Sequence, residues 1–394
     1  MASDKKDELL IMAVGDVFVN RADPPTVFAD VAPVLRQGDI VVGTLEGVVC
    51  DTGRPIDGKI EVGSVHLRCA PDNLRALESA GFNAMILANN HNMDFGAEGL
   101  VQCLDLLDKK NIAHAGGGRN YEDAHKPAIV ERNGVKVAIL SYTSIYIAGY
   151  AAEKDKPGLA TIKVHTSYQA PENLDYQPGY PPIMVTIPAT VDQDRMIRDV
   201  QNAKKVADLV LVAFHWGVSW GFNRVVGYQK ELGRAAIDAG ADLILGSHPH
   251  ALHAMEMYKD KLICYCMGNF VMDGMSNAHF GADTMILKCR VKDKKISKYS
   301  FVPVRISEKW QPYPLDGNDG KNVMKKMESM SVEFGTTFSM VDGEIIIGGP
   351  KPGTPQARRG LSIEPHRGLP VLYDALLPLP YIMAKIKAGE FEQK

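Results

Sequence analysis

The feature that most constrains the fold is a repeated unit, a short apolar run followed directly by polar residues that bind metals or move protons. Five such runs predict buried strands at residues 9–14, 39–43, 83–87, 209–214 and 242–245. The polar clusters that follow them are Gly15-Asp16, Thr44-Leu45-Glu46, residues 89–94, His215-Trp216-Gly217 and residues 246–250. Because ligands of open α/β sheets bind beyond the carboxyl ends of the strands, we expect the five clusters to converge on one site.

Helical patterns alternate with the apolar runs, which predicts the α/β class. Helices are expected at residues 71–80, 97–110, 191–207, 228–239 and 318–332, and further strands at 135–142, 251–258, 261–267, 284–291 and 295–304. Asn133-Gly134 is typical of a hairpin turn. We expect one domain over residues 1–340, followed by a Gly/Pro-rich C-terminal extension, residues 341–394, that packs on it and ends in a short helix from Pro378.

Residues 148–190 form an insertion in this domain that is rich in proline and tyrosine. Linkers are poor in aromatic residues, so the segment is expected to be structured. Tyr150, Tyr168, Tyr176 and Tyr180 offer flat apolar faces with a hydroxyl group, which favours a substrate wall that sets specificity. The alternative is a surface excursion that packs on the body without touching the site.

The composition excludes several classes of function. A net charge of −3 and a pI near 6.4 argue against a nucleic-acid surface. No apolar run reaches the roughly 20 residues of a membrane span, and the polar N-terminus lacks the apolar core of a signal peptide, so we expect a cytoplasmic protein. A homo-oligomer is compatible with the sequence. The six cysteines include no Cys-x-x-Cys pair and are predicted to be free, buried thiols.

Asp16 and Glu46 are the candidate carboxylate ligands. Asp16 follows a glycine at a predicted strand end, where a simple turn or cap is the alternative. Glu46 ends an apolar run, where a carboxylate must bind a metal or pair with a Lys or Arg to avoid a large desolvation cost. Carboxylates suit hard and borderline cations, so one or two divalent metal ions are predicted, and Zn, Mn, Fe and Ca all fit these residue types.

Residues 89–94, Asn-Asn-His-Asn-Met-Asp, combine a candidate ligand with a candidate acid/base group. Asn90 offers an amide oxygen to a metal, and His91 offers an imidazole for proton transfer. Asp94 can orient His91 by accepting its other ring proton. The alternative is a capping cluster for the helix expected at 97–110, which the Asn and Asp content also suits.

Three histidines complete the set of candidate ligands. His215 follows an all-apolar run, where a lone histidine is more often structural. His248 and His250 lie two residues apart around a proline, so they can face one metal or two adjacent ones, and His253 lies nearby.

A set of motifs points to a known family. Between residues 9 and 273, in order, stand Gly-Asp-Val, Thr-Leu-Glu-Gly, Ala-Asn-Asn-His-Asn-Met-Asp-Phe-Gly, His-Ala-Gly-Gly-Gly, His-Trp-Gly, Ala-Gly-Ala-Asp-Leu-Ile-Leu-Gly-Ser-His-Pro-His and Met-Gly-Asn-Phe-Val. With them the chain resembles the CapA family, named for capsule and poly-γ-glutamate synthesis, which in turn resembles the calcineurin-like metallophosphoesterases. Residues 158–166, the proline-rich run near Pro178 and residues 331–338 resemble a branch with a long insertion.

The resemblance implies the calcineurin-like metallophosphatase fold, a four-layer α/β/β/α sandwich with metal at the strand ends. The metal ligands that it implies are Asp16, Glu46, Asn90, His215, His248 and His250. It also implies that His91 is the general acid and that Asp94 orients it.

The chain departs from this superfamily in its first two motifs. Metallophosphoesterases usually carry Asp-x-His in the first motif, and here Phe18 stands in place of that histidine. Glu46 stands in place of the usual bridging aspartate. One of two metal positions therefore loses a ligand, which predicts a single ion, or a second ion bound weakly.

Three classes of function follow. The leading hypothesis is a metal-dependent hydrolase that cleaves a phosphoester or an amide or peptide-type bond of a small-molecule or peptide-like substrate, with a metal-activated water and His91 as acid/base. The second is an isomerase, epimerase or carbon–carbon lyase that moves a proton at the same site, which the lost ligand favours. The third is an accessory protein of poly-γ-glutamate or capsule synthesis, against which the absence of a membrane span counts.

Overall fold

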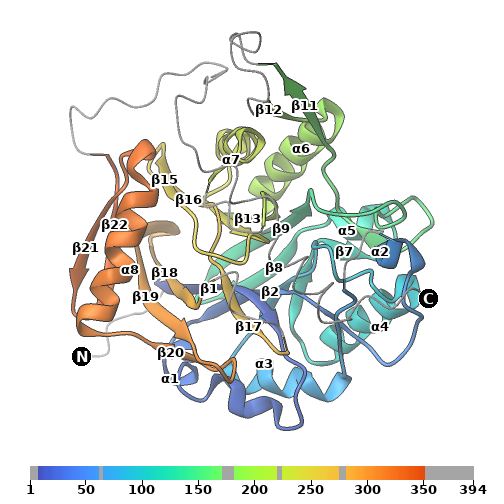
Figure 1. Cartoon of the computed structure of the whole chain (residues 1–394), viewed down its shortest axis with the longest axis horizontal. Helices are drawn as coiled ribbons and strands as arrows, with labels where there is room; N and C mark the ends of the chain where they lie inside the picture. Colours follow the sequence, from blue (N-terminus) through green and yellow to red (C-terminus); the bar gives the residue numbers. More distant parts are fainter. Residues whose placement is uncertain (1–7, 62–64, 171–181, 220–223, 275–280, 351–394) are drawn as a thin grey trace, which may run out of the picture. The chain divides into compact units, whose positions relative to one another are not determined.

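The computed structural model describes residues 8–61, 65–170, 182–219, 224–274 and 281–350. The chain divides into two compact units, one of residues 1–164 and 188–357 and the other of residues 165–187 and 358–394. The first unit is a mixed α/β structure that contains two large sheets and every candidate ligand. Figure 1 shows the order of its elements along the chain.

The larger sheet has ten described strands in the order β21-β22-β19-β18-β1-β2-β5-β6, with β17 paired to β1 and β20 to β19. These are β1 Leu9–Phe18, β2 Ile40–Leu45, β5 Ala84–Ile86, β6 Ala113–Ala115, β17 Asn269–Met272, β18 Asp283–Lys292, β19 Lys295–Ile306, β20 Pro312–Pro314, β21 Thr337–Val341 and β22 Glu344–Gly348. Strands β1, β2, β5, β6 and β17 are parallel, so their carboxyl ends share one edge of the sheet.

The second sheet has six described strands in the order β15-β16-β14-β13-β9-β8. They are β8 Ala128–Arg132, β9 Val135–Thr143, β13 Leu209–His215, β14 Leu243–Ser247, β15 Met255–Tyr258 and β16 Lys261–Cys264. Strands β9, β13, β14 and β16 are parallel. The β8–β9 hairpin turns at Asn133 and Gly134, whose φ angles of 52° and 79° are the left-handed values that an Asn-Gly turn requires.

Helices complete the first unit. They are α1 Ala32–Leu35, α2 Asp57–Glu61, α3 Leu74–Ala80, α4 Gly96–Lys109, α5 Tyr121–His125, α6 Thr190–Val206, α7 Gly227–Ala239 and α8 Gly317–Met330. The short strands β3 Val48–Val49 and β4 Arg68–Cys69 pair with each other, as do β7 Gly117–Gly118 and β10 Gly158–Leu159. The helices predicted at 97–110, 191–207, 228–239 and 318–332 are confirmed within one or two residues. The helix predicted at 71–80 begins as the 3-10 helix Pro71–Asn73 and is an α-helix only from Leu74.

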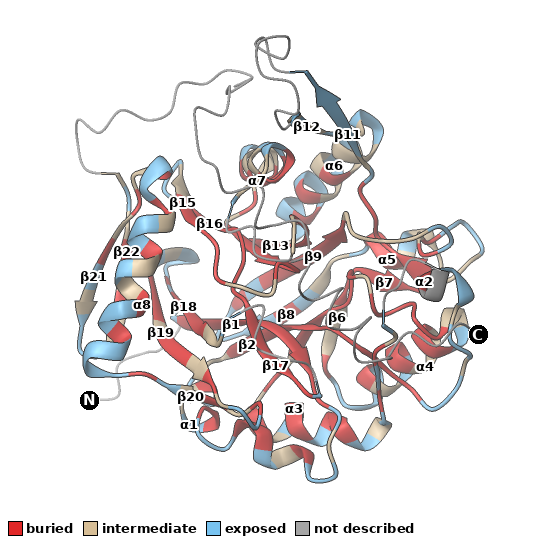
Figure 2. Cartoon of the chain, viewed as in Figure 1, coloured by how far each residue is buried: buried red, intermediate tan, exposed pale blue. Residues whose placement is uncertain are grey.

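Alternating side chains of each central strand enter different hydrophobic cores. In β1, Ile11 and Ala13 pack in a core shared with β9, β13 and β14, whereas Met12 and Val14 pack in a core with α1, α3 and α4. The outward side chains of β9, β13 and β14 form a third core with α6 and α7. Figure 2 shows the central strands of both sheets, such as β1, β2 and β13, buried along most of their length and α6 and α7 buried on one side only.

The second unit is described only at residues 165–170 and 182–187. Strands β11 Val164–Gln169 and β12 Ile183–Pro188 form a two-stranded sheet. The predicted insertion at 148–190 is therefore split, because Tyr150 is buried in the first unit and Tyr168 is an exposed residue of β11. Tyr176 and Tyr180 lie outside the described residues, so the substrate wall stays a prediction.

Three expectations about element bounds need correction. Strand β1 does not end at residue 14 but runs to Phe18, so Asp16 lies inside it. Strands β15 and β16 are shorter than predicted, and beyond them the pairing continues as separate contacts, such as the antiparallel bridge between Leu252 and Met267. The larger sheet extends through β22 to Gly348, beyond the predicted boundary at 340, and the extension at 351–394 with its expected helix lies outside the described residues.

Two predictions from composition can be compared with the described residues. All six cysteines are free and buried, as expected. Among the helices that the structure describes, none is long and apolar enough to cross a membrane.

The bulge of β1 before Asp16 depends on Gly15. The pairing of β1 with β2 shifts register between Ala13 and Asp16, and Asp16 N–H donates to the carbonyl of Gly268 over 3.1 Å. A Cβ atom on Gly15 would lie 1.8 Å from that same carbonyl oxygen. Only glycine therefore allows the approach that places Asp16 beside β17.

We predict that Gly15→Ala lowers the free energy of unfolding by about 3 kcal/mol, because the added methyl group meets backbone that cannot move aside. Urea unfolding monitored by circular dichroism measures the change. Gly58→Ala is the control, since a Cβ there meets only the flexible end of Ile147 at 3.5 Å. Equal stability of the two variants would show that the close approach at Gly15 does not constrain the fold.

Candidate metal centre

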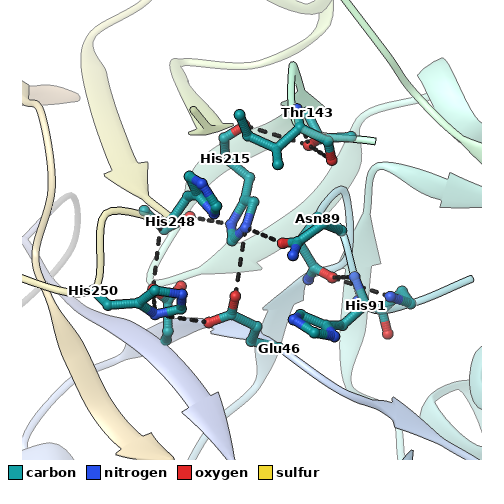
Figure 3. Close-up of polar contacts among 12 residues, drawn as sticks. Glu46, Asn89, His91, Thr143, His215, His248 and His250 are labelled. Carbon is teal, nitrogen blue, oxygen red and sulfur yellow. Dashed lines mark hydrogen bonds and ion pairs between the residues drawn. The ribbon is translucent and has the colours of Figure 1, made fainter. Parts of the chain in front are cut away.

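The five polar clusters converge, as the sequence predicted. Glu46 follows β2, residues 89–91 follow β5, His215 ends β13, and His248 and His250 follow β14, so both sheets contribute. Figure 3 shows Glu46, His215, His248 and His250 pointing toward one another, with Asn89 and His91 on one side. The convergence arises because parallel strands present their carboxyl ends at a common edge.

Two carboxylates are buried at the centre of this cluster. Asp16 and Glu46 are completely inaccessible to solvent. Burial raises the pKa of Asp16 to about 7, and burial together with the nearby Asp16 raises the pKa of Glu46 well above its usual range. Within the described chain, both oxygens of Glu46 and Oδ1 of Asp16 accept no hydrogen bond. Carboxylates in this state require a cation or protons, because buried anions without partners are costly.

Three neutral imidazoles surround the carboxylates. His215 Nε2 lies 3.5 Å from Glu46 Oε1, and His250 Nδ1 lies 3.6 Å from both Glu46 Oε2 and Asp16 Oδ2. The ring centroids of His215 and His248 are 4.9 Å apart. Burial lowers the pKa of His215 and His248 well below the usual value and that of His250 to about 4. All three are therefore neutral near pH 7, the form in which imidazole binds metals.

The ligand-type atoms fall into two groups that share one residue. Glu46, His215 and His248 form the first, Asp16, Glu46 and His250 form the second, and the candidate atoms within each group lie within 4.8 Å of one another. Carboxylate oxygens and imidazole nitrogens suit borderline divalent ions such as zinc. The unpartnered oxygens of Glu46 and Asp16 thus fit a pair of adjacent cation positions, with Glu46 between them.

Backbone conformation aims the two histidines after β14. His248 and His250 have φ angles of 95° and 61°, which residues other than glycine rarely adopt, and Pro249 lies between them. His248 N–H donates to Asp16 Oδ2 over 3.3 Å, which ties this turn to β1. Unfavourable backbone conformations of this kind concentrate at functional sites, where surrounding contacts hold them.

Neighbouring polar groups fix the ring orientations. Ser247 Oγ lies 2.9 Å from His215 Nδ1, Asn90 Oδ1 lies 2.7 Å from His215 Nε2, and Asn269 Oδ1 lies 2.8 Å from His250 Nδ1. Such contacts select the tautomer of a ligand histidine. His253 is also buried, but it belongs to neither candidate group.

His91 and Asp94 form a buried pair beside the cluster, as predicted. His91 Nδ1 lies 2.8 Å from Asp94 Oδ2, so Asp94 orients the ring through Nδ1 and leaves Nε2 for other partners. Burial lowers the pKa of His91, and the hydrogen bond to Asp94 offsets part of that effect. The proximity of His91 adds to the effect of burial in lowering the pKa of His215, His248 and His250.

Asp94 is held by four donors, three of which the sequence did not reveal. Its Oδ2 accepts the Leu67 N–H at 2.7 Å as well as His91, and its Oδ1 accepts from Lys59 Nζ and from the Tyr150 hydroxyl at 3.0 Å. Burial alone would raise the pKa of Asp94, but His91 and Lys59 bring it below the usual value. Each oxygen of the ionised Asp94 carboxylate therefore accepts two hydrogen bonds, and Asp94 does not cap α4.

Lys59 was missed because lysine is ordinarily an exposed residue. Here it is 3% exposed, and its Nζ donates to the Asn90 carbonyl at 2.6 Å and lies 2.9 Å from His91 Nδ1. Since His91 Nδ1 donates its proton to Asp94, Lys59 does not donate to this ring nitrogen but to Asp94 and to the Asn90 carbonyl. Asn269 was missed as well, although the Met-Gly-Asn-Phe-Val motif could have pointed to it.

Comparison with known proteins adds independent information. The family model described as "Bacterial capsule synthesis protein PGA_cap" matches residues 10–274. The chain is 29% identical over 356 residues to the capsule biosynthesis protein CapA of Bacillus anthracis, covering 87% of this chain and 78% of that protein. It is 29% identical over 332 residues to the PGA biosynthesis protein CapA of Bacillus subtilis strain 168, covering 82% and 78%. It is 27% identical over 279 residues to a probable polyglutamine synthesis accessory protein of Mycobacterium tuberculosis, covering 68% and 66%.

We predict that Lys59→Met lowers the free energy of unfolding by about 3 kcal/mol, because it leaves the buried Asp94 without its cation. Tyr150→Phe removes a single hydrogen bond to the same carboxylate and is expected to cost about 1 kcal/mol. Urea unfolding of both variants measures the difference. A Lys59→Met protein as stable as the wild type would contradict the charge-pair interpretation.

We predict that Glu46→Gln weakens metal binding at both positions, because its two oxygens face different histidines, whereas His248→Ala weakens binding at one. Calorimetric titration of metal-free protein with Zn²⁺, checked by elemental analysis, gives stoichiometry and affinity. His253→Ala is the matched control, since His253 is a buried histidine outside both groups. Full stoichiometric metal in Glu46→Gln and His248→Ala would remove both residues from the ligand set.

Proposed function

This chain belongs to the bacterial capsule synthesis protein family PGA_cap, and from its site we propose that it is a metal-dependent enzyme that hydrolyses a phosphoester or an amide-type bond. One observation carries the proposal. The buried carboxylates of Asp16 and Glu46, without hydrogen-bond donors for three of their oxygens, lie among neutral histidines and beside an oriented His91–Asp94 pair. Cation binding and proton transfer are the two capacities that such an arrangement provides.

The proposed fold is the four-layer α/β/β/α sandwich of the calcineurin-like metallophosphatases. Three separate cores support it, one between the two sheets and one beneath the helices on each outer side. In this arrangement the ligand clusters lie where the carboxyl ends of the parallel strands of both sheets meet.

The proposed ligands are Asp16, Glu46, Asn90, His215, His248 and His250. A divalent ion held there supplies positive charge that polarises a substrate oxygen and lowers the pKa of water from ~15.7 towards ~7. Glu46 would contribute an oxygen to each position, since its two oxygens lie near His215 and His250 respectively. The sheets and helices exclude water from the carboxylates, which strengthens their attraction for a cation.

His91 is the proposed acid/base residue. With Nδ1 fixed on Asp94, its Nε2 is the ring nitrogen that exchanges a proton with the substrate. Lys59 and Tyr150 hold Asp94 in place, so the orientation of the imidazole does not depend on the substrate. A preset orientation of this kind reduces the reorganisation needed during proton transfer.

A second candidate is an accessory role in the synthesis of poly-γ-glutamate or capsule. The names of the relatives favour it, because two are CapA biosynthesis proteins and one is a probable polyglutamine synthesis accessory protein. A screen of phosphate monoesters and diesters against amide and peptide substrates, with metal-loaded protein, separates the candidates. Hydrolysis supports the enzyme, whereas stoichiometric metal without turnover favours the accessory role. Substrate conversion without bond hydrolysis favours an isomerase or lyase.

We predict that His91→Ala retains the fold and the bound metal but loses about 10²–10⁴-fold in kcat, the scale expected for a general acid or base. Steady-state kinetics on the substrate found in the screen, together with metal analysis, measures both effects. His114→Ala is the control, because His114 lies on β6 and contacts Asp108 on the surface. A change in kcat below about threefold for His91→Ala would remove His91 from the mechanism.

A further inference from the structure

Strand β17 brings a second buried asparagine to the metal centre. Its pairing with β1 sets Asn269 opposite Asp16, and the two residues are 2% and 0% exposed. Asn269 Oδ1 lies 2.8 Å from His250 Nδ1, the ring nitrogen that faces the carboxylates. A buried amide so close to a candidate ligand atom is itself a candidate ligand.

The distances from His250 Nδ1 to its neighbours are close to those between donor atoms that bind one ion. Nδ1 lies 2.8 Å from Asn269 Oδ1 and 3.6 Å from Asp16 Oδ2 and from Glu46 Oε2. Donor atoms bound to one ion at about 2.1 Å lie roughly 3 to 3.5 Å from one another. The three distances from Nδ1 lie within a few tenths of an ångström of this range, so small shifts of the side chains would allow these atoms to bind one cation.

The other position shows the same pattern. His215 Nε2 lies 2.7 Å from Asn90 Oδ1 and 3.5 Å from Glu46 Oε1. Each position thus combines one oxygen of Glu46, one histidine nitrogen and one asparagine oxygen. Asn269 thus lies beside His250 in the same way that Asn90 lies beside His215.

The contact between His250 Nδ1 and Asn269 Oδ1 is compatible with the site both without and with a bound ion. Without an ion, Nδ1 carries a proton that it donates to Asn269 Oδ1. When Nδ1 binds an ion it has no proton, and two acceptors 2.8 Å apart would then repel each other unless a cation lies between them. A cation bound by both atoms would therefore take the place of that proton.

Strand β1 supplies only Asp16 to this position. Phe18, two residues further on, is buried in the core with α3 and α4, and its ring is so close to Gly47 that a Cβ there would lie 2.4 Å away. The second position would therefore lack a second ligand from β1. Strand β17, the neighbour of β1, is the element placed to provide one.

We propose that Asn269 Oδ1 is a metal ligand and completes the position formed by Asp16, Glu46 and His250. The proposal rests on the proposed metal-dependent function. It corrects the expectation that the second position is short of a ligand, because the missing donor comes from β17.

The test compares two matched variants, Asn269→Leu and Asn90→Leu, in the full chain. Metal-free protein is titrated with Zn²⁺ by calorimetry, and bound metal is counted by elemental analysis. Wild-type protein is expected to bind two ions, and each variant to lose more than about 100-fold in affinity at one position while the other is unchanged. Asn269→Ala replaces Asn269→Leu if the circular dichroism spectrum shows that the larger side chain disturbs the fold.

Co²⁺ spectroscopy separates a ligand from a residue that only orients His250. Loss of a ligand changes the intensity of the visible absorption per bound Co²⁺, whereas loss of an orienting contact lowers affinity by about 10–100-fold and leaves the spectrum unchanged. An unchanged spectrum, or wild-type Zn²⁺ binding by Asn269→Leu while Asn90→Leu loses an ion, overturns the proposal for Asn269 alone. Wild-type protein that binds no metal overturns the proposed function as well.

Discussion

The buried pair Asp16 and Glu46 is the constraint on which the rest of the site depends. Burial raises the pKa of both carboxylates, the neighbouring Asp16 raises that of Glu46 further, and three of their four oxygens accept no hydrogen bond within the described chain. The histidines around them are neutral and offer lone pairs rather than positive charge. The fold thus places two buried carboxylates together and leaves their charge to be compensated by a cation or by protons.

In the adjoining part of the site, around Asp94, the chain itself compensates the charge of the buried carboxylate. Asp94 is as deeply buried as Asp16, but the chain itself supplies its cation, Lys59, and three further donors. This half is electrically balanced and can hold His91 in one orientation whatever is bound nearby. The contrast between the two halves distinguishes the residues suited to hold metal from the residues suited to move a proton.

The sheets provide the precision that this arrangement needs. Asp16 sits at a bulge of β1 that only Gly15 permits, and the pairing of β1 with β17 sets Asn269 opposite it. His248 and His250 adopt left-handed backbone conformations that the contacts of the turn maintain. Side chains placed by backbone pairing keep their relative positions, which metal centres require because ligand distances tolerate little variation.

Much of this could be predicted from the sequence, because apolar periodicity and strand-end polarity are local properties. They gave the α/β class, the main helices within three residues, and the convergence of Asp16, Glu46, Asn90, His91, His215, His248 and His250. Other features depend on contacts between distant segments, which local patterns do not contain. Lys59 meets Asp94 across 35 residues, Tyr150 meets it across 56, and Asn269 reaches Asp16 through a strand pairing over more than 250 positions. The tertiary structure alone decided these partners, because burial and charge compensation are set by what packs against a side chain and not by its neighbours in the chain.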